Sequence, residues 1–167
     1  MTICALVVAV LTLGPFTVSA QTTAKQASTV GTWKLDIAKS SFGSEPAPKA
    51  VTLTILKDTP EFSSWKVDVV VDEKGESISY SWTGPVDGSL QPVKDPKGQV
   101  IFQESLKRDK DGALLRHGVD STDGSSFDAR ATVSADGNTI TDVVTSKTKD
   151  GKTSKATMVF QRVTAAK

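Results

Sequence analysis

The chain has 167 residues, of which 38% are hydrophobic and 23% charged, with 20 Lys and Arg residues against 19 Asp and Glu residues. This is the composition of one globular domain that is long enough to bury a substantial core. The formal net charge of +1 and the aromatic content of 6% argue against a nucleic-acid-binding surface and an anionic membrane partner, which require basic patches or exposed aromatic stacks.

The N-terminal segment is typical of a secretory signal peptide. Residues 3–13 are apolar or small, and small residues precede Gln21, although no basic residue stands before the apolar run. The run is too short to anchor the chain in a membrane. We therefore expect a cleaved signal peptide over residues 1–20, a flexible leader over 21–30 and a secreted or periplasmic mature chain that does not insert into a membrane.

From residue 31 onward, the hydrophobic pattern predicts strands rather than helices. Apolar and polar residues alternate with a period of two over 65–72, and the same alternation recurs over 77–82 and 100–107. Residues 38–42 form at most one helical turn. Pairs of a polar residue and glycine separate the strands and suit tight hairpin turns, because glycine adopts positive φ without steric cost. These pairs stand at 74–75, 87–88, 97–98, 111–112, 123–124, 136–137 and 150–151.

The turns also predict which residues face one another. In an antiparallel hairpin, paired residue numbers have a constant sum and paired side chains point to the same face. We assume a four-residue loop at 109–112, three-residue loops at 122–124 and 149–151, and a two-residue turn at 136–137. One apolar face then runs through five successive strands. The pairs expected on it are Phe102–Val119, Leu106–Leu115, Val119–Phe127, Val133–Ile140, Val144–Ala156 and Ile140–Phe160.

A meander with one apolar face must hide that face, either by closing into a barrel or by folding into two packed sheets. Closure removes the exposed edges, and the connections are too short for Greek keys. The sequence therefore predicts an all-β fold with a single up-and-down antiparallel β-barrel of about 8–10 strands.

Residues 31–55, GTWKLDIAKSSFGSEPAPKAVTLTI, resemble the opening of small secreted bacterial proteins described as lipocalin-like. Those proteins typically read G-T-W-K-L-N-x-A-K-S-x-F, followed by P-A-P-K and a strand. The resemblance continues loosely through DGSLQPV at 87–93, where Gln91 replaces the family's usual tyrosine. It implies a lipocalin-like (calycin-type) barrel domain over residues 31–164.

The resemblance also implies how the barrel is closed at one end. In lipocalins, the tryptophan of a G-x-W motif lies at the closed end, and a basic residue of the last strand packs across it. The matching residues here are Gly31, Trp33 and Arg162. The register above places Phe160, and with it Arg162, on the inward face, where a guanidinium can cover an indole. The alternative is an ordinary core tryptophan with a solvated arginine; on either interpretation the role is structural.

Residues suited to catalysis or metal binding are few. The chain has one histidine, His117, and its one cysteine, Cys4, lies in the signal segment. No phosphate-binding loop, nucleophile motif or metal-ligand spacing is found, so we expect no catalytic residue, metal or cofactor. The predicted register does pair Glu104 with His117 on the inward face, which also carries Asp142. These groups would orient a ligand's polar head, or form a satisfied ion pair in the core or at a wet rim.

Small inward residues, among them Ala129 and Ala131, leave room in the barrel unless bulky neighbours fill it. We therefore expect a monomer that binds or carries a small apolar or amphipathic ligand without catalysis. The alternatives are a structural or protein-interaction module of the cell envelope without a pocket, and a barrel isomerase or hydrolase that uses Glu104 and His117. The ligand-contacting residues expected in the interior are Glu104, His117, Phe102, Leu115, Phe127, Asp142, Met158, Tyr80 and Trp82.

Overall fold

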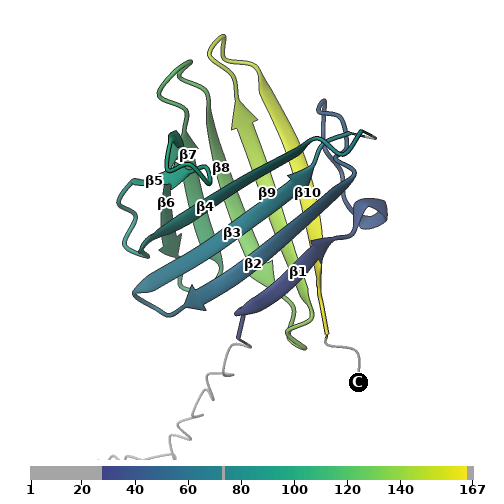
Figure 1. The fold of residues 1–167 in the computed structure, drawn as a ribbon. Coiled ribbons are helices and arrows are strands. Elements are labelled where there is room, and N and C mark those ends of the chain that lie inside the picture. Colours follow the sequence, from purple (N-terminus) through teal and green to yellow (C-terminus); the bar gives the residue numbers. More distant parts are fainter. Residues whose placement is uncertain (1–27, 73, 165–167) are drawn as a thin grey trace, which may run out of the picture.

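The computed structural model describes residues 28–72 and 74–164, which form a closed antiparallel β-barrel (Figure 1). Each strand pairs with the next along the chain, and β1 closes the barrel against β10. The strands are β1 (Gly31–Leu35), β2 (Ala50–Asp58), β3 (Phe62–Val70), β4 (Ser77–Pro85), β5 (Gln91–Lys94), β6 (Val100–Arg108), β7 (Leu114–Val119), β8 (Ser126–Val133), β9 (Thr139–Lys147) and β10 (Thr153–Arg162). The predicted up-and-down barrel is thus confirmed, with ten strands over the described residues.

Helical structure in this part of the chain is limited to a 3-10 turn, η1 (Ile37–Lys39), which overlaps residues 38–42, where at most one turn was expected. No helix able to cross a membrane is found among the described residues. The predicted signal peptide, residues 1–20, and most of the predicted leader lie outside these residues.

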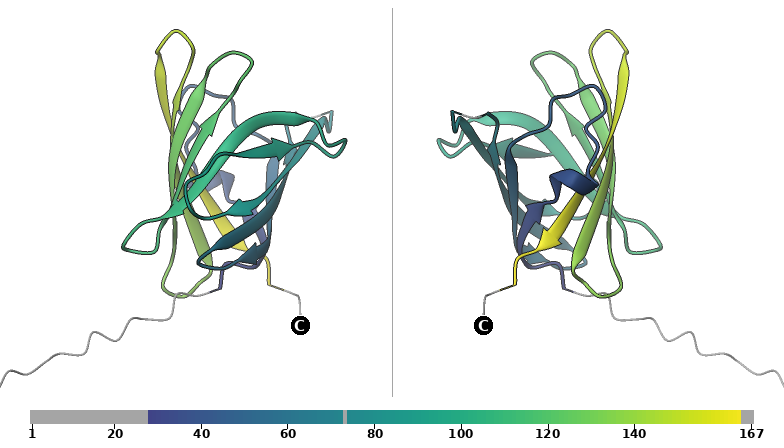
Figure 2. Two further views of the ribbon diagram at one scale, coloured as in Figure 1. Left: turned by 90° about the vertical axis from the view of Figure 1, so that its left-hand side faces the viewer. Right: turned by 90° about the vertical axis from the view of Figure 1, so that its right-hand side faces the viewer.

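The two ends of the barrel differ (Figure 2). The start of β1 and the end of β10 lie at one end, which we call the lower end, together with the β8–β9 hairpin. The β7–β8 and β9–β10 hairpins extend beyond the strands at the opposite, upper end. The long connection between β1 and β2 also lies on the upper side.

The register of β7 differs from the prediction by one residue. Ser105 faces His117 across β6 and β7, and His117 faces Asp128 across β7 and β8. The expected pairs Phe102–Val119, Leu106–Leu115, Val119–Phe127 and Glu104–His117 were therefore wrong. The two errors have opposite signs, so β7 alone is reversed between inside and outside. The pairs Val133–Ile140, Val144–Ala156 and Ile140–Phe160 are confirmed.

The turn between β6 and β7 explains the difference. The Asp109 carboxylate accepts hydrogen bonds from the backbone N–H groups of Asp111 and Ala113, both at 2.9 Å. Gly112 has a positive φ of 81° and donates its N–H to the Asp109 carbonyl. Asp109 and Ala113 consequently form the last backbone pair, which leaves a loop one residue shorter than assumed and turns Arg116 inward.

Two groups of buried apolar side chains form the core. One surrounds Trp65 and Trp82, and the other surrounds Trp33 and Phe160. Leu53, Ile55 and Val67 pack against both groups and connect them. The two groups therefore form one connected core inside the barrel.

Candidate binding site in the barrel interior

The lower end of the barrel is closed by Trp33 and Arg162. Trp33 is fully buried, and its Nε1 donates a hydrogen bond of 2.8 Å to the Thr29 carbonyl. The Arg162 guanidinium carbon lies 4.1 Å from the centre of the indole, and the two residues pair directly across β1 and β10. This is the arrangement expected from the G-x-W resemblance, a cation–π contact that covers the indole.

Backbone carbonyls hold Arg162 in this position. Its guanidinium donates to the carbonyls of Gly137 at 2.8 Å, Val30 at 2.9 Å and Ser28. Gly31 has a φ of +138°, and a Cβ there would lie 3.0 Å from Arg162 Nη1. A side chain at this position would strain the backbone and crowd the guanidinium, which accounts for the glycine before Trp33. We assign these three residues a structural role.

A cavity of about 320 Å³ lies inside the barrel. It reaches from Pro48, in the connection before β2, to Asp58 at the far end of that strand, and thus extends along the length of β2. Most of its wall is apolar. Residues that contribute to this wall include Val51, Leu53, Ile55, Val67, Val69, Ala131, Val133, Ile140, Met158 and Phe160. The volume lies at the lower end of the range of small-molecule sites.

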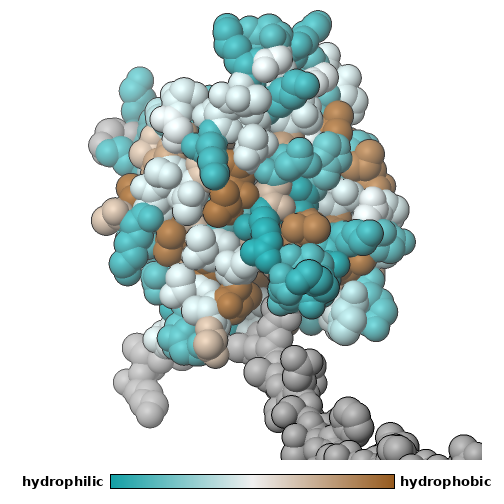
Figure 3. All heavy atoms as spheres, turned by 180° about the vertical axis from the view of Figure 1, so that it is seen from behind, coloured by the Kyte–Doolittle hydropathy of each residue, from teal (hydrophilic) through white to brown (hydrophobic). Residues whose placement is uncertain are grey.

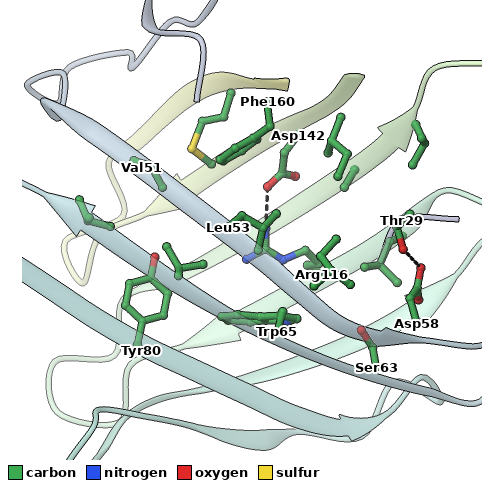
Figure 4. A pocket seen from close by; sticks show the side chains of 18 of the residues that line it. Thr29, Val51, Leu53, Asp58, Ser63, Trp65, Tyr80, Arg116, Asp142 and Phe160 are labelled. Atoms are coloured by element: carbon green, nitrogen blue, oxygen red, sulfur yellow. Dashed lines mark hydrogen bonds and ion pairs between the residues drawn. The ribbon is translucent and has the colours of Figure 1, made fainter. Parts of the chain in front are cut away.

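Three charged side chains, Glu104 of β6, Arg116 of β7 and Asp142 of β9, form a cluster inside the barrel. Figure 4 shows two of them, Arg116 and Asp142. Arg116 Nε donates to Glu104 Oε1 at 2.6 Å, and Arg116 Nη1 donates to Asp142 Oδ2 at 2.6 Å. Glu104 and Asp142 are buried, with 0% and 3% of their surfaces exposed. Burial alone would lower the pKa of Arg116, but the attraction of both carboxylates outweighs it and raises the pKa. Arg116 therefore remains a cation.

The cluster is incompletely satisfied. Glu104 Oε2 and Asp142 Oδ1 are buried and have no hydrogen-bond partner among the described residues. Two carboxylates share one guanidinium, so the cluster carries a formal excess of one negative charge. Unpaired buried oxygens are costly and are rarely left in a core without a reason. Asp142 and Arg116 both lie in the cavity wall, so the charged cluster borders the empty space, although its two unpartnered oxygens are buried.

Aromatic rings surround the guanidinium. The Arg116 guanidinium carbon lies 5.9 Å from the Trp65 ring centre and 5.6 Å from that of Phe127. Tyr80 packs edge-on against Trp65 and Phe102. Burial raises the pKa of Tyr80, which keeps its hydroxyl protonated and able to donate. Figure 4 shows this hydroxyl directed into the cavity, and it forms no hydrogen bond with another described residue.

The lower part of the cavity wall carries a second, neutral pair. Arg108 Nη2 donates to Asp58 Oδ1, and Thr29 Oγ1 donates to the other oxygen of the same carboxylate. All three residues contribute to the cavity wall. Because one carboxylate meets one guanidinium, this pair adds no net charge to the interior.

The predicted interior residues fall into three groups. Tyr80, Asp142 and Met158 contribute to the cavity wall. The prediction was wrong for His117 and Leu115, because the reversed β7 turns both outward: 45% of the His117 side chain is exposed and its Nδ1 lies 2.9 Å from Asp128 Oδ1, while Leu115 is 37% exposed. Residues that pack inside the barrel around the cavity rather than forming its wall are Glu104, Phe102, Phe127 and Trp82.

Arg116 is the central residue that the sequence prediction missed. It stands next to His117, and only the register of β7 decides which of the two points inward. Two signals favoured Arg116: the Asp109–Gly112 turn, and Gly118, which faces Phe127. A Cβ at Gly118 would lie 2.0 Å from Phe127 Cε1, and a glycine within a strand often marks such a close approach.

No group of three or more His, Cys, Asp or Glu residues suited to a metal ion is found in the described part of the chain. Comparison of the chain with protein-family models, with curated proteins and with solved structures finds no match in any of the three.

Proposed function

We propose that the chain is a secreted or periplasmic lipocalin-like protein that binds and carries a small apolar or amphipathic molecule inside its barrel, as a monomer and without catalysis. The observation that carries the proposal is the cavity of about 320 Å³, with its apolar wall and one incompletely satisfied charged cluster. An apolar wall with a few polar groups that fix orientation is the usual composition of small-molecule sites.

The apolar wall suits a short hydrocarbon chain or a ring system. Each buried methylene group contributes about 0.8 kcal/mol, so a chain of about ten carbons gains roughly 8 kcal/mol before the cost of association is subtracted. That cost leaves micromolar or weaker binding from the chain alone. Hydrogen bonds from the cluster would then add orientation and selectivity.

A separate surface role has less support. Exposed apolar side chains such as Leu56 and Leu115 exist, but on the face in Figure 3 the apolar areas are small and separated by hydrophilic ones. Contiguous apolar patches are the usual sign of a docking surface. The alternative of an isomerase or hydrolase requires Glu104 and His117 to lie together. Glu104 lies inside the barrel, whereas His117 lies on its outer face.

Narrowing the cavity tests the proposal. Ala131 of β8 lies in the cavity wall, so Ala131→Leu should fill part of the space and weaken the binding of phenylnaphthylamine, an uncharged fluorescent probe, by about tenfold or more. Thr145→Leu is the matched control, because Thr145 is exposed on β9. The measurement is saturable fluorescence enhancement on titration of the purified protein. Interior binding would be contradicted if the probe fluorescence did not saturate with the wild-type protein, or if the wild type and Ala131→Leu bound the probe equally well.

A further inference from the structure

The Arg116 guanidinium is not a free anchor for an anion. A lone arginine in an apolar cavity would be expected to hold a carboxylate or phosphate, for which its geometry is suited. Here Glu104 and Asp142 already take its Nε and Nη1 donors at 2.6 Å each. An anionic ligand would have to approach two carboxylates that face a single guanidinium.

The Arg116 side chain still offers donors to the cavity. This side chain is 22% exposed. Because it points into the barrel and lies in the cavity wall, its exposed surface faces the ligand space. A guanidinium has five N–H donors, of which the two carboxylates take only part. The Tyr80 hydroxyl lies in the same wall. An oxygen acceptor without charge can use these donors without adding to the excess negative charge.

A cationic head meets the opposite difficulty. Beside the charged cluster, the accessible polar groups of the cavity wall are the donors of Arg116 and Tyr80, and an ammonium group cannot accept a hydrogen bond from either. The carboxylate of Asp58, elsewhere in the wall, is already paired with Arg108 and Thr29. The unpartnered oxygen of Asp142 is buried, so an ammonium would reach the negative charge only past the guanidinium. An anionic head is therefore disfavoured by the carboxylates of Glu104 and Asp142, and a cationic head by the guanidinium of Arg116.

Building on the interior binding proposed above, we propose that the natural ligand is an amphiphile with an uncharged oxygen-bearing head, a hydroxyl or carbonyl. The head accepts hydrogen bonds from Arg116 and Tyr80, and the carboxylate excess of Glu104 and Asp142 excludes fatty-acid-like anions.

A series of ligands with one chain and different heads tests this proposal. Decanol, decanoate and decylammonium are each used to displace phenylnaphthylamine from the wild-type protein at neutral pH. We expect decanol to bind about tenfold or more tightly than either charged compound. Equal or tighter binding of decanoate or decylammonium would overturn the assignment of an uncharged head. If the probe itself does not bind, the interior function fails instead, so the two failures are distinguishable.

Removing one negative charge tests the cause of the selectivity. Asp142→Asn keeps the shape and an oxygen for Arg116 Nη1 but neutralises the excess charge, so decanoate affinity should rise by about tenfold while decanol changes little. Asp128→Asn is the matched control, since it removes the same charge from the outer surface, where Asp128 is 80% exposed. If circular dichroism shows that Asp142→Asn is unfolded, Glu104→Gln makes the same change in charge. Unchanged decanoate affinity in the folded variant would overturn the charge argument.

Discussion

Adjacent residues 116 and 117 illustrate how much depends on a single side-chain direction. Arg116 joins two buried carboxylates inside the barrel, and His117 meets Asp128 in solvent. Removing one member of a buried charged network leaves its partners without compensation, whereas an exposed ion pair contributes little. Two residues that are adjacent on one strand therefore contribute very differently to the free energy of unfolding.

We expect Arg116→Met to lower the free energy of unfolding by about 3–5 kcal/mol, because Glu104 and Asp142 would remain buried without a cation. His117→Met should change it by about 1 kcal/mol or less. Urea unfolding followed by tryptophan fluorescence measures both variants. The reverse order of the two losses would show that β7 has the register expected from the sequence rather than that of the structure.

At the scale of elements, acidic residues in the hairpin turns hold the loops in shape. In the β8–β9 turn, Asp136 accepts hydrogen bonds from Ser134 Oγ at 2.5 Å and from the Asn138 N–H at 3.1 Å, and these bonds lower the pKa of Asp136. In the β7–β8 turn, Thr122 lowers the pKa of Asp120 in the same way. A carboxyl whose pKa is lower in the folded chain stabilises the fold above the unfolded pKa, and this contribution is lost as the pH falls through the folded value.

The turn carboxylates should therefore make the barrel sensitive to acid below about pH 4. We expect Asp136→Asn to have a lower Tm than the wild type at about pH 6, and this difference to shrink as the pH is lowered toward about 2.5, because the Asp136 carboxyl of the folded wild type becomes protonated. Thermal unfolding by circular dichroism across this range provides the comparison. Ser134→Ala removes the first of these hydrogen bonds. Its Tm should therefore also fall further below the wild-type Tm at about pH 6 than at low pH. A constant difference at all pH values would contradict this origin.

The same turns decided which strand registers could be predicted. The loops at 136–137 and 149–151 gave the observed pairs of β8, β9 and β10. On β7 the hydrophobic pattern was ambiguous, because Leu114 and Leu115 are equally apolar. The two registers are distinguished by the backbone bonds accepted by Asp109 and by Gly118, which faces Phe127. A β6–β7 loop one residue shorter than assumed and a β7–β8 loop one residue longer together exchanged His117 for Arg116 in the site.

At the scale of the molecule, the barrel followed from alternation and turn spacing, because a continuous apolar face requires closure. The volume of the cavity could not be predicted in this way, since it depends on how large rings such as Trp65 and Trp82 stack, at 6.3 Å and 11°. The charged cluster likewise depends on three strands meeting at one level. The sequence pattern therefore predicts the strands of the barrel wall, whereas side-chain packing determines the cavity and the charged cluster inside it.

The wall of the barrel is unevenly bonded. β9 and β10 pair over nine residues, from Thr153–Lys147 to Gln161–Thr139, whereas Ser81–Lys94 is the one pair between β4 and β5 in the described structure. The register also shifts between Val93 and Lys94, where β5 meets β6. Strand segments with few backbone hydrogen bonds open at low free-energy cost, so the seam between β4 and β5 is the weakest part of the barrel.

We therefore expect the amide groups of β5 to exchange with deuterium faster than those of the other strands, and those of β9 and the paired part of β10 to be among the slowest. Hydrogen exchange followed by mass spectrometry on the intact protein measures this directly. A ligand that bridges the interior walls should slow exchange at the seam more than in β9, because opening there would expose the ligand to water. Uniform protection of all strands, or exchange in β9 faster than in β5, would contradict an opening at this seam.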